Sequence, residues 1–338
     1  MTHAARSDQP VLAANMGGSV DAMLHGTAIV ILTWNQCKQT LRCLQSLADA
    51  GYALSQVVLW DNGSVDGTDE AVINKFPDVV FHRHPSNQGV ASGRNAATLL
   101  AIRKLSPSHL LFLDNDMVVT PGFLESLCEP FTLEPQLAQA MAKIRFLNDP
   151  DRLHSAGGQV VNFSLGIKHG IGYGEVDAGQ YDEQQSCLPS GGATLVALSV
   201  FLELDGFDSI FDPFGAEDLD FAYRVRGAGY QATYIPESIV YHDYQRKSGA
   251  GPDGDSYIAA RVRHWIILLR RHATLAQQVG FFAGGAVVGL IKVALREGLN
   301  GNVASLKGIP TGVKRFVSDR PQKESVRNES RDVGIETD

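Results

Sequence analysis

The stretch "SHLLFLDNDMVV", residues 108–119, decides how the rest of the chain is interpreted. Its residues 110–113 are all apolar, which is the pattern of a strand buried on both faces. Asp114 and Asp116 follow this strand directly, with Asn115 between them. A buried carboxylate needs a partner, because a charge that leaves water without gaining a hydrogen bond or a counter-ion costs free energy. The stretch therefore predicts a buried strand that ends at a binding site.

Upstream of this strand, short apolar runs alternate with amphipathic stretches. Strands are expected at residues 28–33, 56–61 and 79–82, and helices at 38–50, 69–76 and 90–104. Nearly continuous apolar strands separated by helices are typical of a parallel, doubly wound sheet. Beyond residue 142 the regularity weakens, and we expect a strand at 190–198, a helix at 219–227 and an extended pair at 230–242. The prediction is an α/β fold with a Rossmann-like, mostly parallel central sheet and a mixed second half.

Composition limits the function classes. The chain has 338 residues, 44% of them hydrophobic, and a net charge of −8, which argues against a general nucleic-acid binder. The four cysteines show no C-x-x-C spacing, and the N-terminus has no basic region followed by an apolar run. We therefore expect a cytoplasmic protein with buried, unpaired cysteines.

Polar side chains follow three of the predicted strands, at residues 33–35, 61–62 and 114–116. In parallel α/β sheets the ligand lies beyond the carboxyl ends of the strands, so these groups should meet in one crevice. Asp114 and Asp116 would repel each other unless a cation lies between them, and Mg²⁺ and Mn²⁺ prefer oxygen ligands. The alternative is that both aspartates only cap the turn that follows.

Two further groups of residues carry potential chemistry. Glu217, Asp218 and Asp220 stand at the start of a predicted amphipathic helix. Acids there are favoured by the helix dipole, so they either stabilise the helix or supply a general base. His242 follows an apolar strand and is either a metal ligand or a structural histidine.

Six blocks occur in a recognisable order and spacing: "TAIVILTWNQ", "LWDNGSVDGTDE", "NQGVASGRNAA", "LLFLDNDMVV", "PSGGATLVALSVFLELDGFDSIF" and "GAEDLDFAYRVRGAGYQATYIPESIVYH". Together they resemble glycosyltransferase family 2, and in particular its bacterial rhamnosyltransferase-like and polysaccharide-assembly members. The resemblance covers residues 27–242 and implies the GT-A fold. It also implies a catalytic domain at 26–250, after a flexible arm at 1–25.

The resemblance assigns a first group of residues to the nucleotide. Asp61, in its D-N-G-S block, resembles the aspartate that hydrogen-bonds the base. Thr33, Trp34 and Asn35 resemble the lip of the same pocket, beside the end of the first strand.

A second group lies under the nucleotide. Asn87, Gly89, Gly93 and Asn95 match an N-x-G-x-x-x-G-x-N block, in which the glycines permit close backbone approach. Arg94, within this block, either reaches a phosphate or lies on the surface of its helix.

The aspartates of the opening stretch resemble the D-x-D pair. Asp116 is then a direct metal ligand, Asp114 is shared between ribose and metal, and Asn115 belongs to the donor site. His242 lies at a distance from Asp218 similar to that in members where a histidine completes the metal shell. The implied cofactor is a divalent cation, Mn²⁺ or Mg²⁺.

The remaining assignments concern the sugar. Asp218 matches the second position of the E-D motif and would be the general base, with Glu217 in the donor site. Gly192 lies in a small-residue strand beside the donor sugar. The implied reaction is inverting transfer from a dTDP- or UDP-sugar to a glycan or lipid-linked acceptor during surface polysaccharide synthesis.

Two alternatives stay open. A sugar nucleotidyltransferase also uses a parallel α/β sheet and a carboxylate-bound cation, but normally has a glycine-rich loop where this chain has "TWNQCKQT". A catalytically inactive GT-A scaffold that binds glycans would share the fold, although Asp114, Asp116, Asp218 and His242 are all present.

The C-terminal segment differs from the rest. We expect a helical extension at 251–317 and a disordered charged tail at 318–338, and residues 261–320 carry a net charge of +8. The apolar core at 279–291 is shorter than the roughly 20 residues of a spanning helix and contains glycines, so we do not expect it to cross a membrane. Arginines and Trp265 precede it, and this helix either contacts the inner face of the cytoplasmic membrane peripherally or packs on the catalytic domain.

Overall fold

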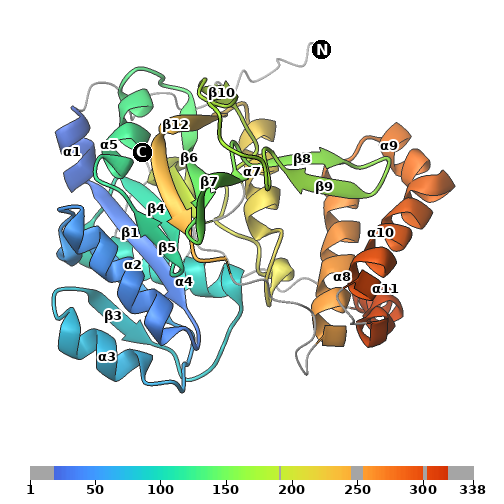
Figure 1. The fold of residues 1–338 in the computed structure, drawn as a ribbon, viewed down its shortest axis with the longest axis horizontal. Coiled ribbons are helices and arrows are strands. Elements are labelled where there is room, and N and C mark those ends of the chain that lie inside the picture. The colour runs from blue at the N-terminus through green and yellow to red at the C-terminus, as the bar shows by residue number, and fades with distance from the viewer. Residues whose placement is uncertain (1–18, 190–191, 245–253, 300–302, 319–338) are drawn as a thin grey trace, which may run out of the picture.

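The computed structural model describes residues 19–189, 192–244, 254–299 and 303–318 (Figure 1). An α/β domain built on one large sheet is joined to a helical C-terminal unit, as Figure 1 shows. Residues at the end of the predicted N-terminal arm form a helix, α1 (Val20–His25), whose Met23 is buried in the core. All but the first residue of the predicted charged tail lies outside the described residues.

The first half of the sheet is parallel. It contains β1 (Thr27–Thr33), β2 (Val57–Asp61), β3 (Val80–Arg83) and β4 (His109–Asp114), in the order β3-β2-β1-β4. Its residues Ile29, Ile31, Leu59 and Leu111 are almost completely buried, because helices cover both faces of parallel sheets. This part confirms the predicted doubly wound pattern.

The second half is mixed, as predicted. β11 (Ala193–Ala197) runs antiparallel to β4, followed by β6 (Leu137–Phe146), β12 (Gln231–His242) and the short β10 (Gln185–Ser186). β5 (Met117–Val119) pairs with β12, and β7 (Asp149–Ser155) with β6. The predicted extended pair at 230–242 is wrong: β12 is one strand. Its pairing with β6 shifts register around Pro236, which cannot donate to the sheet.

The other helices of the α/β domain are α2 (Cys37–Asp49), α3 (Thr68–Lys75), α4 (Val90–Leu105), α5 (Phe123–Cys128), α6 (Leu198–Glu203) and α7 (Glu217–Gly227). Four of them, α2, α3, α4 and α7, agree closely with the predicted ranges, whereas α5 and α6 were not predicted. Short 3₁₀ turns lie at Leu54–Gln56, Glu129–Thr132 and Ser209–Phe211. All four cysteines are unpaired, and Cys43, Cys128 and Cys187 are buried as expected.

The C-terminal unit is a set of helices. It contains α8 (Gly254–His272), α9 (Leu275–Gly280), a π turn (Phe281–Gly285), α10 (Ala286–Leu299), a 3₁₀ turn (Val303–Lys307) and α11 (Gly308–Ser318). The helical stretch Leu275–Leu299 is unbroken and, by length and composition only, could cross a membrane. The apolar core predicted at 279–291 lies inside this longer helical stretch.

A β-hairpin joins the two parts. β8 (Gln159–Asn162) and β9 (Ile167–Gly170) form a separate two-stranded sheet that reaches from the α/β domain to α9 (Figure 1). The hairpin belongs to the region where the sequence pattern is irregular, and no strand was expected there.

Candidate active site

The end of β4 is shaped around one carboxylate. The backbone N–H of Asp114 donates to the Gly192 carbonyl oxygen at 2.8 Å, so β11 begins directly beside it. A Cβ atom on Gly192 would overlap the Asp114 carboxyl group. Glycine is therefore required at position 192 for the Asp114 side chain to lie where it does.

Arg94 connects three elements at this point. Its guanidinium is buried and donates from Nη2 to Asp114 Oδ1 at 2.6 Å and from Nη1 to Glu217 Oε1 at 3.0 Å. A buried charge is tolerated when it is paired and hydrogen-bonded, as here. The alternative that Arg94 lies on the surface of its helix is wrong, because α4 directs it inward to β4 and α7.

The three acids of α7 have different surroundings. Glu217 is buried against Arg94, and its pKa rises to about 7 because burial and the neighbouring Asp218 outweigh the arginine. Asp220 is fully buried on another side of the helix and pairs with Arg224, Arg271 and His272 at 2.8–3.1 Å. Asp218 stays partly exposed, and its Oδ1 accepts from the Leu219 N–H. Of the three, Asp218 is therefore the carboxylate that a substrate can reach.

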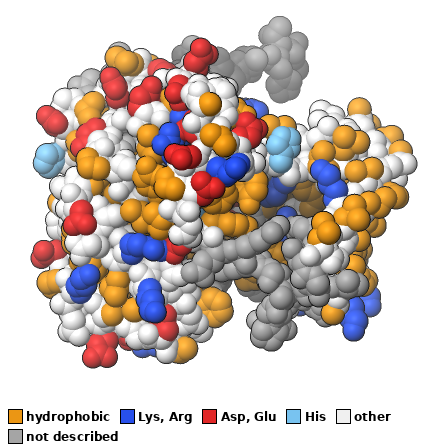
Figure 2. All heavy atoms as spheres, in the orientation of Figure 1, with side chains coloured by type: hydrophobic (Ala, Val, Ile, Leu, Met, Phe, Trp, Pro, Cys, Tyr) orange, Lys and Arg blue, Asp and Glu red, His pale blue; other side chains and the backbone are white. Residues whose placement is uncertain are grey.

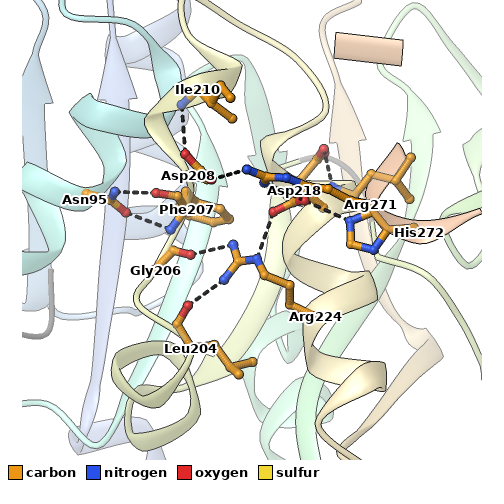
Figure 3. Close-up of polar contacts among 12 residues, drawn as sticks. Asn95, Leu204, Gly206, Phe207, Asp208, Ile210, Asp218, Arg224, Arg271 and His272 are labelled. Carbon is orange, nitrogen blue, oxygen red and sulfur yellow. Dashed lines mark hydrogen bonds and ion pairs between the residues drawn. The ribbon is translucent and has the colours of Figure 1, made fainter. Parts of the chain in front are cut away.

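Contacts behind α7 hold the Asp220 side of the helix in place (Figure 3). Arg224 donates to the carbonyl oxygens of Leu204 and Gly206 at 2.6 and 2.7 Å, and Arg271 pairs with Asp208. The loop 204–211 is thereby tied to both α7 and α8.

Asn95 belongs to this network. Its amide exchanges two hydrogen bonds with the backbone of Phe207, at 2.7 and 3.0 Å (Figure 3). It was expected under the nucleotide, but the structure places its amide against loop 204–211, where it joins α4 to that loop.

The end of β2 carries a buried carboxylate, Asp61, of which one oxygen accepts no hydrogen bond from the described residues. Asp61 Oδ1 accepts from the backbone N–H and the hydroxyl of Ser64 at 2.8 and 2.6 Å. Asp61 Oδ2 is buried and has no hydrogen-bond partner among the described residues, and Arg83 Nε lies 3.9 Å away. A buried acceptor without a donor costs about 1–3 kcal/mol, which a ligand N–H at this atom would recover.

The predicted lip of this pocket is only partly at the surface. Trp34 is 49% exposed. Asn35 has a φ of +52° and joins the neighbouring loop, because its N–H donates to Ser64 Oγ and its Oδ1 accepts from the Val65 N–H. Trp34 and Asn35 thus stand at the rim beside Asp61.

Thr33 and Asn115 have an internal role. The Thr33 hydroxyl is buried and hydrogen-bonds the Thr40 hydroxyl at 2.8 Å. Asn115 Nδ2 donates to both hydroxyls, at 3.1 and 3.0 Å. The residue between the two aspartates therefore fixes their turn to β1 and α2, and the Thr33 hydroxyl lies beneath the rim.

The glycine-rich block forms a tight loop. Asn87 Oδ1 accepts from the Gly89 N–H at 2.9 Å and from Asn62 Nδ2 at 3.2 Å. Gly89 has a φ of +99°, and a Cβ on Gly93 would lie 3.0 Å from Asn62 Nδ2. Gly89 is thus required by its backbone conformation and by the nearby Asp212 side chain, and Gly93 by the close approach of α4 to Asn62 after β2.

Asp116 and His242 come together from β12 and the β4–β5 turn. His242 Nε2 lies 3.3 Å from Asp116 Oδ2, and His242 Nδ1 has no partner among the described residues. Burial lowers the pKa of His242. The hydrogen bond to Asp116 and the charge of Asp116 have the larger, opposite effect, so the pKa of His242 is raised overall. The His154 ring packs edge-on against His242, with centroids 4.5 Å apart.

The predicted metal-ligand set is not assembled as a trio. In the described part of the chain, no three His, Cys, Asp or Glu side chains form a group that could hold a metal ion alone. The reason is that Asp114 faces Arg94, which leaves Asp116 and His242 as the neighbouring pair. Such a pair fits a cation that takes its other ligands from phosphate oxygens and water.

Sequence reasoning missed several members of this site. His154 lies in a stretch without periodicity, and no local pattern indicates its contact with His242. Arg271 and His272 are about 50 residues from Asp220, in a segment interpreted only as basic. The buried position of Arg94 follows from its two acidic partners, which stand 20 and 123 residues further along the chain.

Comparisons with known proteins agree with this geometry. Residues 25–260 match the model of the family described as glycosyltransferase like family 2. The N-acetylglucosaminyl-diphospho-decaprenol L-rhamnosyltransferase of Mycobacterium tuberculosis is 25% identical over 266 residues, 72% of this chain and 84% of that protein. The pre-mycofactocin glycosyltransferase of the same species is 24% identical, over 74% of this chain and 50% of that protein.

Solved structures show the same fold. A mannosyltransferase from Pyrobaculum calidifontis, in complex with GDP-Man and Mn²⁺, has a TM-score of 0.51 and 16% identity, covering 87% of this chain and 88% of that chain. GalNAc-T7 with UDP, GalNAc and Mn²⁺ has a TM-score of 0.51 and 17% identity, covering 69% and 48%. The mixed sheet is thus that of the GT-A fold.

Proposed function

The chain belongs to glycosyltransferase like family 2, and from that membership we propose that it moves a sugar from a nucleoside diphosphate sugar to an acceptor hydroxyl. The observation that supports the proposal is that the three acids at the start of α7 have different surroundings. Glu217 and Asp220 are paired inside the protein, and Asp218 is left at the substrate side. A partly exposed carboxylate held at a fixed helix end is suited to take a proton from a hydroxyl.

The proposed reaction inverts the sugar. Asp218 accepts the proton of the acceptor hydroxyl while the hydroxyl oxygen attacks the anomeric carbon, and the diphosphate leaves from the opposite face. No covalent sugar–enzyme intermediate is needed. Arg94 pairs with Asp114 at the end of β4 and with Glu217 at the start of α7, and thereby holds these two carboxylates in fixed positions.

We propose Asp116 and His242 as the protein ligands of a divalent cation, Mn²⁺ or Mg²⁺. Two structural neighbours are described with Mn²⁺, and the carboxylate–imidazole pair suits Mn²⁺. When bound, such a cation stabilises the negative charge on the departing diphosphate. Asp114 Oδ1 is paired with Arg94, so Asp114 would reach the cation through Oδ2.

For the nucleotide we propose uracil or thymine. The free Oδ2 of Asp61 is an acceptor, and the imide N–H of both bases is a donor of the matching kind. The donor is thus a UDP- or dTDP-sugar, with dTDP-rhamnose suggested by the likeness to a rhamnosyltransferase.

A donor panel tests this assignment. Thermal shift with UDP-, dTDP- and GDP-sugars should show stabilisation by one uracil or thymine donor, about 2.7 kcal/mol at 100 times the dissociation constant. EDTA should remove most of it. Asp61→Asn should raise the KM of that donor about tenfold with little change in kcat, because a hydrogen bond to a charged group is lost. A GDP-sugar that binds best would contradict the base assignment.

The acceptor we propose is a glycan or lipid-linked sugar at the inner face of the cytoplasmic membrane. The relative from M. tuberculosis is named for a diphospho-decaprenol substrate. In this chain, Figure 2 shows apolar side chains spread over the C-terminal helices, and Val279, Phe282, Ile291 and Leu295 are each more than half exposed. Such a surface, with basic residues nearby, is suited to peripheral contact with an anionic bilayer.

Vesicle sedimentation tests this contact. The double change Val279→Asp and Phe282→Asp should reduce binding to anionic vesicles at least tenfold, because burying two apolar side chains in lipid contributes several kcal/mol. Both side chains are exposed, so the fold should be unaffected. Leu133→Asp, on an equally exposed leucine of the α/β domain, is the matched control. Equal sedimentation of both variants would contradict membrane contact through α9.

The two alternatives are less well supported. The family membership favours sugar transfer over a nucleotidyltransferase. The Arg94 cluster and the placement of Asp218 favour an active enzyme over a glycan-binding scaffold, because a scaffold has no need of either.

A further inference from the structure

The tip of the β8–β9 hairpin is seated on glycines of the C-terminal apolar helix. A Cβ on Gly285 would overlap the Ser164 carbonyl, and one on Gly280 would lie 3.2 Å from Ser164 Cβ. On the hairpin side, Gly166 has a φ of +65°, and a Cβ there would lie 2.8 Å from the Phe281 ring. The glycines that interrupt the apolar segment thus allow close contact between helix and hairpin.

The same turn of the hairpin also packs on the side of the molecule that carries Asp218. Phe163 is buried, and its ring lies 5.7 Å from the rings of both Tyr223 on α7 and Trp265 on α8. The hairpin therefore spans from the helix that carries Asp218 to the stretch Leu275–Leu299. Figure 1 shows this bridge between the two parts of the molecule.

Two cationic side chains along this bridge have no acidic partner in the part of the chain that the structure describes. Lys168 on β9 is solvent-exposed, and neither it nor Arg261 on α8 forms an ion pair with a carboxylate among the described residues. The protein around Lys168 lowers its pKa, Asp218 and Glu217 oppose this, and Arg261 adds to it. Lys168 is the cross-strand partner of Val161, and Val161 packs against the apolar cluster shared by Leu219 of α7 and Leu268 of α8. The hairpin thereby places Lys168 beside the helices that carry Asp218 and Arg261.

Arg261 is tied to the loop that leads to the catalytic acid. Its Nη1 donates to the Tyr257 hydroxyl at 2.9 Å, and its guanidinium lies 5.5 Å from the centre of that ring. Tyr257 in turn stacks on Phe214, with centroids 5.2 Å apart and planes at 20°. Phe214 is part of the loop that enters α7, so Arg261 is positioned relative to Asp218 by two aromatic contacts.

We propose that Lys168 and Arg261 form an acceptor subsite for a diphosphate, between Asp218 and the apolar helix Leu275–Leu299. The inference rests on the proposed function. The acceptor sugar would lie at Asp218, its diphosphate at the two cations, and its lipid chain along the exposed face of α9 and α10. Lysine and arginine side chains bind phosphate oxygens through charge-assisted hydrogen bonds, and a diphosphate relieves the repulsion between two neighbouring cations. The ligand class is a lipid-diphosphate-linked sugar.

A pair of acceptors tests the subsite. Both carry the same sugar and the same alkyl chain, but one is linked through a diphosphate and the other through a glycosidic bond without phosphate. Full-length protein is assayed in uncharged detergent micelles, so that anionic headgroups do not contribute. Lys168→Gln and Arg261→Gln should each raise the KM of the diphosphate acceptor about tenfold. The donor KM and the KM of the phosphate-free acceptor should not change.

Two further variants separate charge from structure. Lys168→Arg keeps the charge and should keep most of the affinity for the diphosphate acceptor. Lys104→Gln removes an exposed lysine at the far end of α4 and should behave as wild type. If the two glutamine variants leave the KM of the diphosphate acceptor unchanged, or raise the KM of both acceptors equally, the subsite is refuted while sugar transfer stands. If wild-type protein transfers sugar to neither acceptor, the proposed lipid-linked acceptor fails together with the subsite.

Discussion

Replacement of Asp218 by asparagine is expected to lower kcat about 10³-fold, within the range that general base catalysis contributes. Asparagine preserves the shape and the local hydrogen bond to the Leu219 N–H but cannot accept the acceptor's proton. Neither Glu217 nor Asp220 can replace it, since both are buried in ion pairs. Donor binding should be little affected, so the donor KM should stay within about twofold.

The measurement is the rate of product formation under saturating donor and acceptor, together with donor binding by thermal shift. Glu70→Gln is the matched control, because it removes an exposed acid from the first turn of another helix, α3. It should retain wild-type kcat. If Asp218→Asn transferred sugar at the wild-type rate, another group would have to be the base, and the central assignment of the mechanism would fall.

The fold was largely predictable because its strands carry their own signal. The interiors of β1, β2 and β4 are apolar, which is the pattern of strands in a sheet covered on both faces. β12 was harder to predict as one strand, because Pro236 interrupts its pairing and suggests a turn. The hairpin β8–β9 has no continuous apolar face, and its turn packs on segments that are distant in sequence.

The sequence indicated which residues lie near the site, but it did not indicate which side chains contact one another. A sequence shows that Asp114, Asp116 and His242 follow strands, but not which side chain faces which. Arg94 forms an ion pair with Asp114, and this contact depends on the packing of α4 against β1 and β2. The pairing of Asp220 on α7 depends likewise on Arg271 and His272 of α8, which is distant in sequence. Long-range ion pairs of this kind leave no periodic pattern.

Asp220 is the clearest case of such a pairing. Its side chain is fully buried and lies within 2.8–3.1 Å of Arg224, Arg271 and His272. Burial raises the pKa of Asp220, but the hydrogen bond from His272 and the two arginines outweigh it, so that its pKa falls to about 2. The ion pairs join α7 to α8 and thereby hold α7 against the C-terminal unit.

Asp220→Asn is therefore expected to lower the free energy of unfolding by about 3 kcal/mol, because removing one partner leaves charged side chains without their buried counter-ion. Because the folded pKa of about 2 lies below the ordinary value of 3.8, the aspartate's contribution is complete above about pH 4 and is lost as the pH falls through about 2. The stability difference between wild type and Asp220→Asn should shrink over that range, as chemical denaturation at several pH values can measure. Asp78→Asn, an exposed surface control, should be neutral at every pH. A constant difference down to pH 2 would show that Asp220 acts through packing and not through charge.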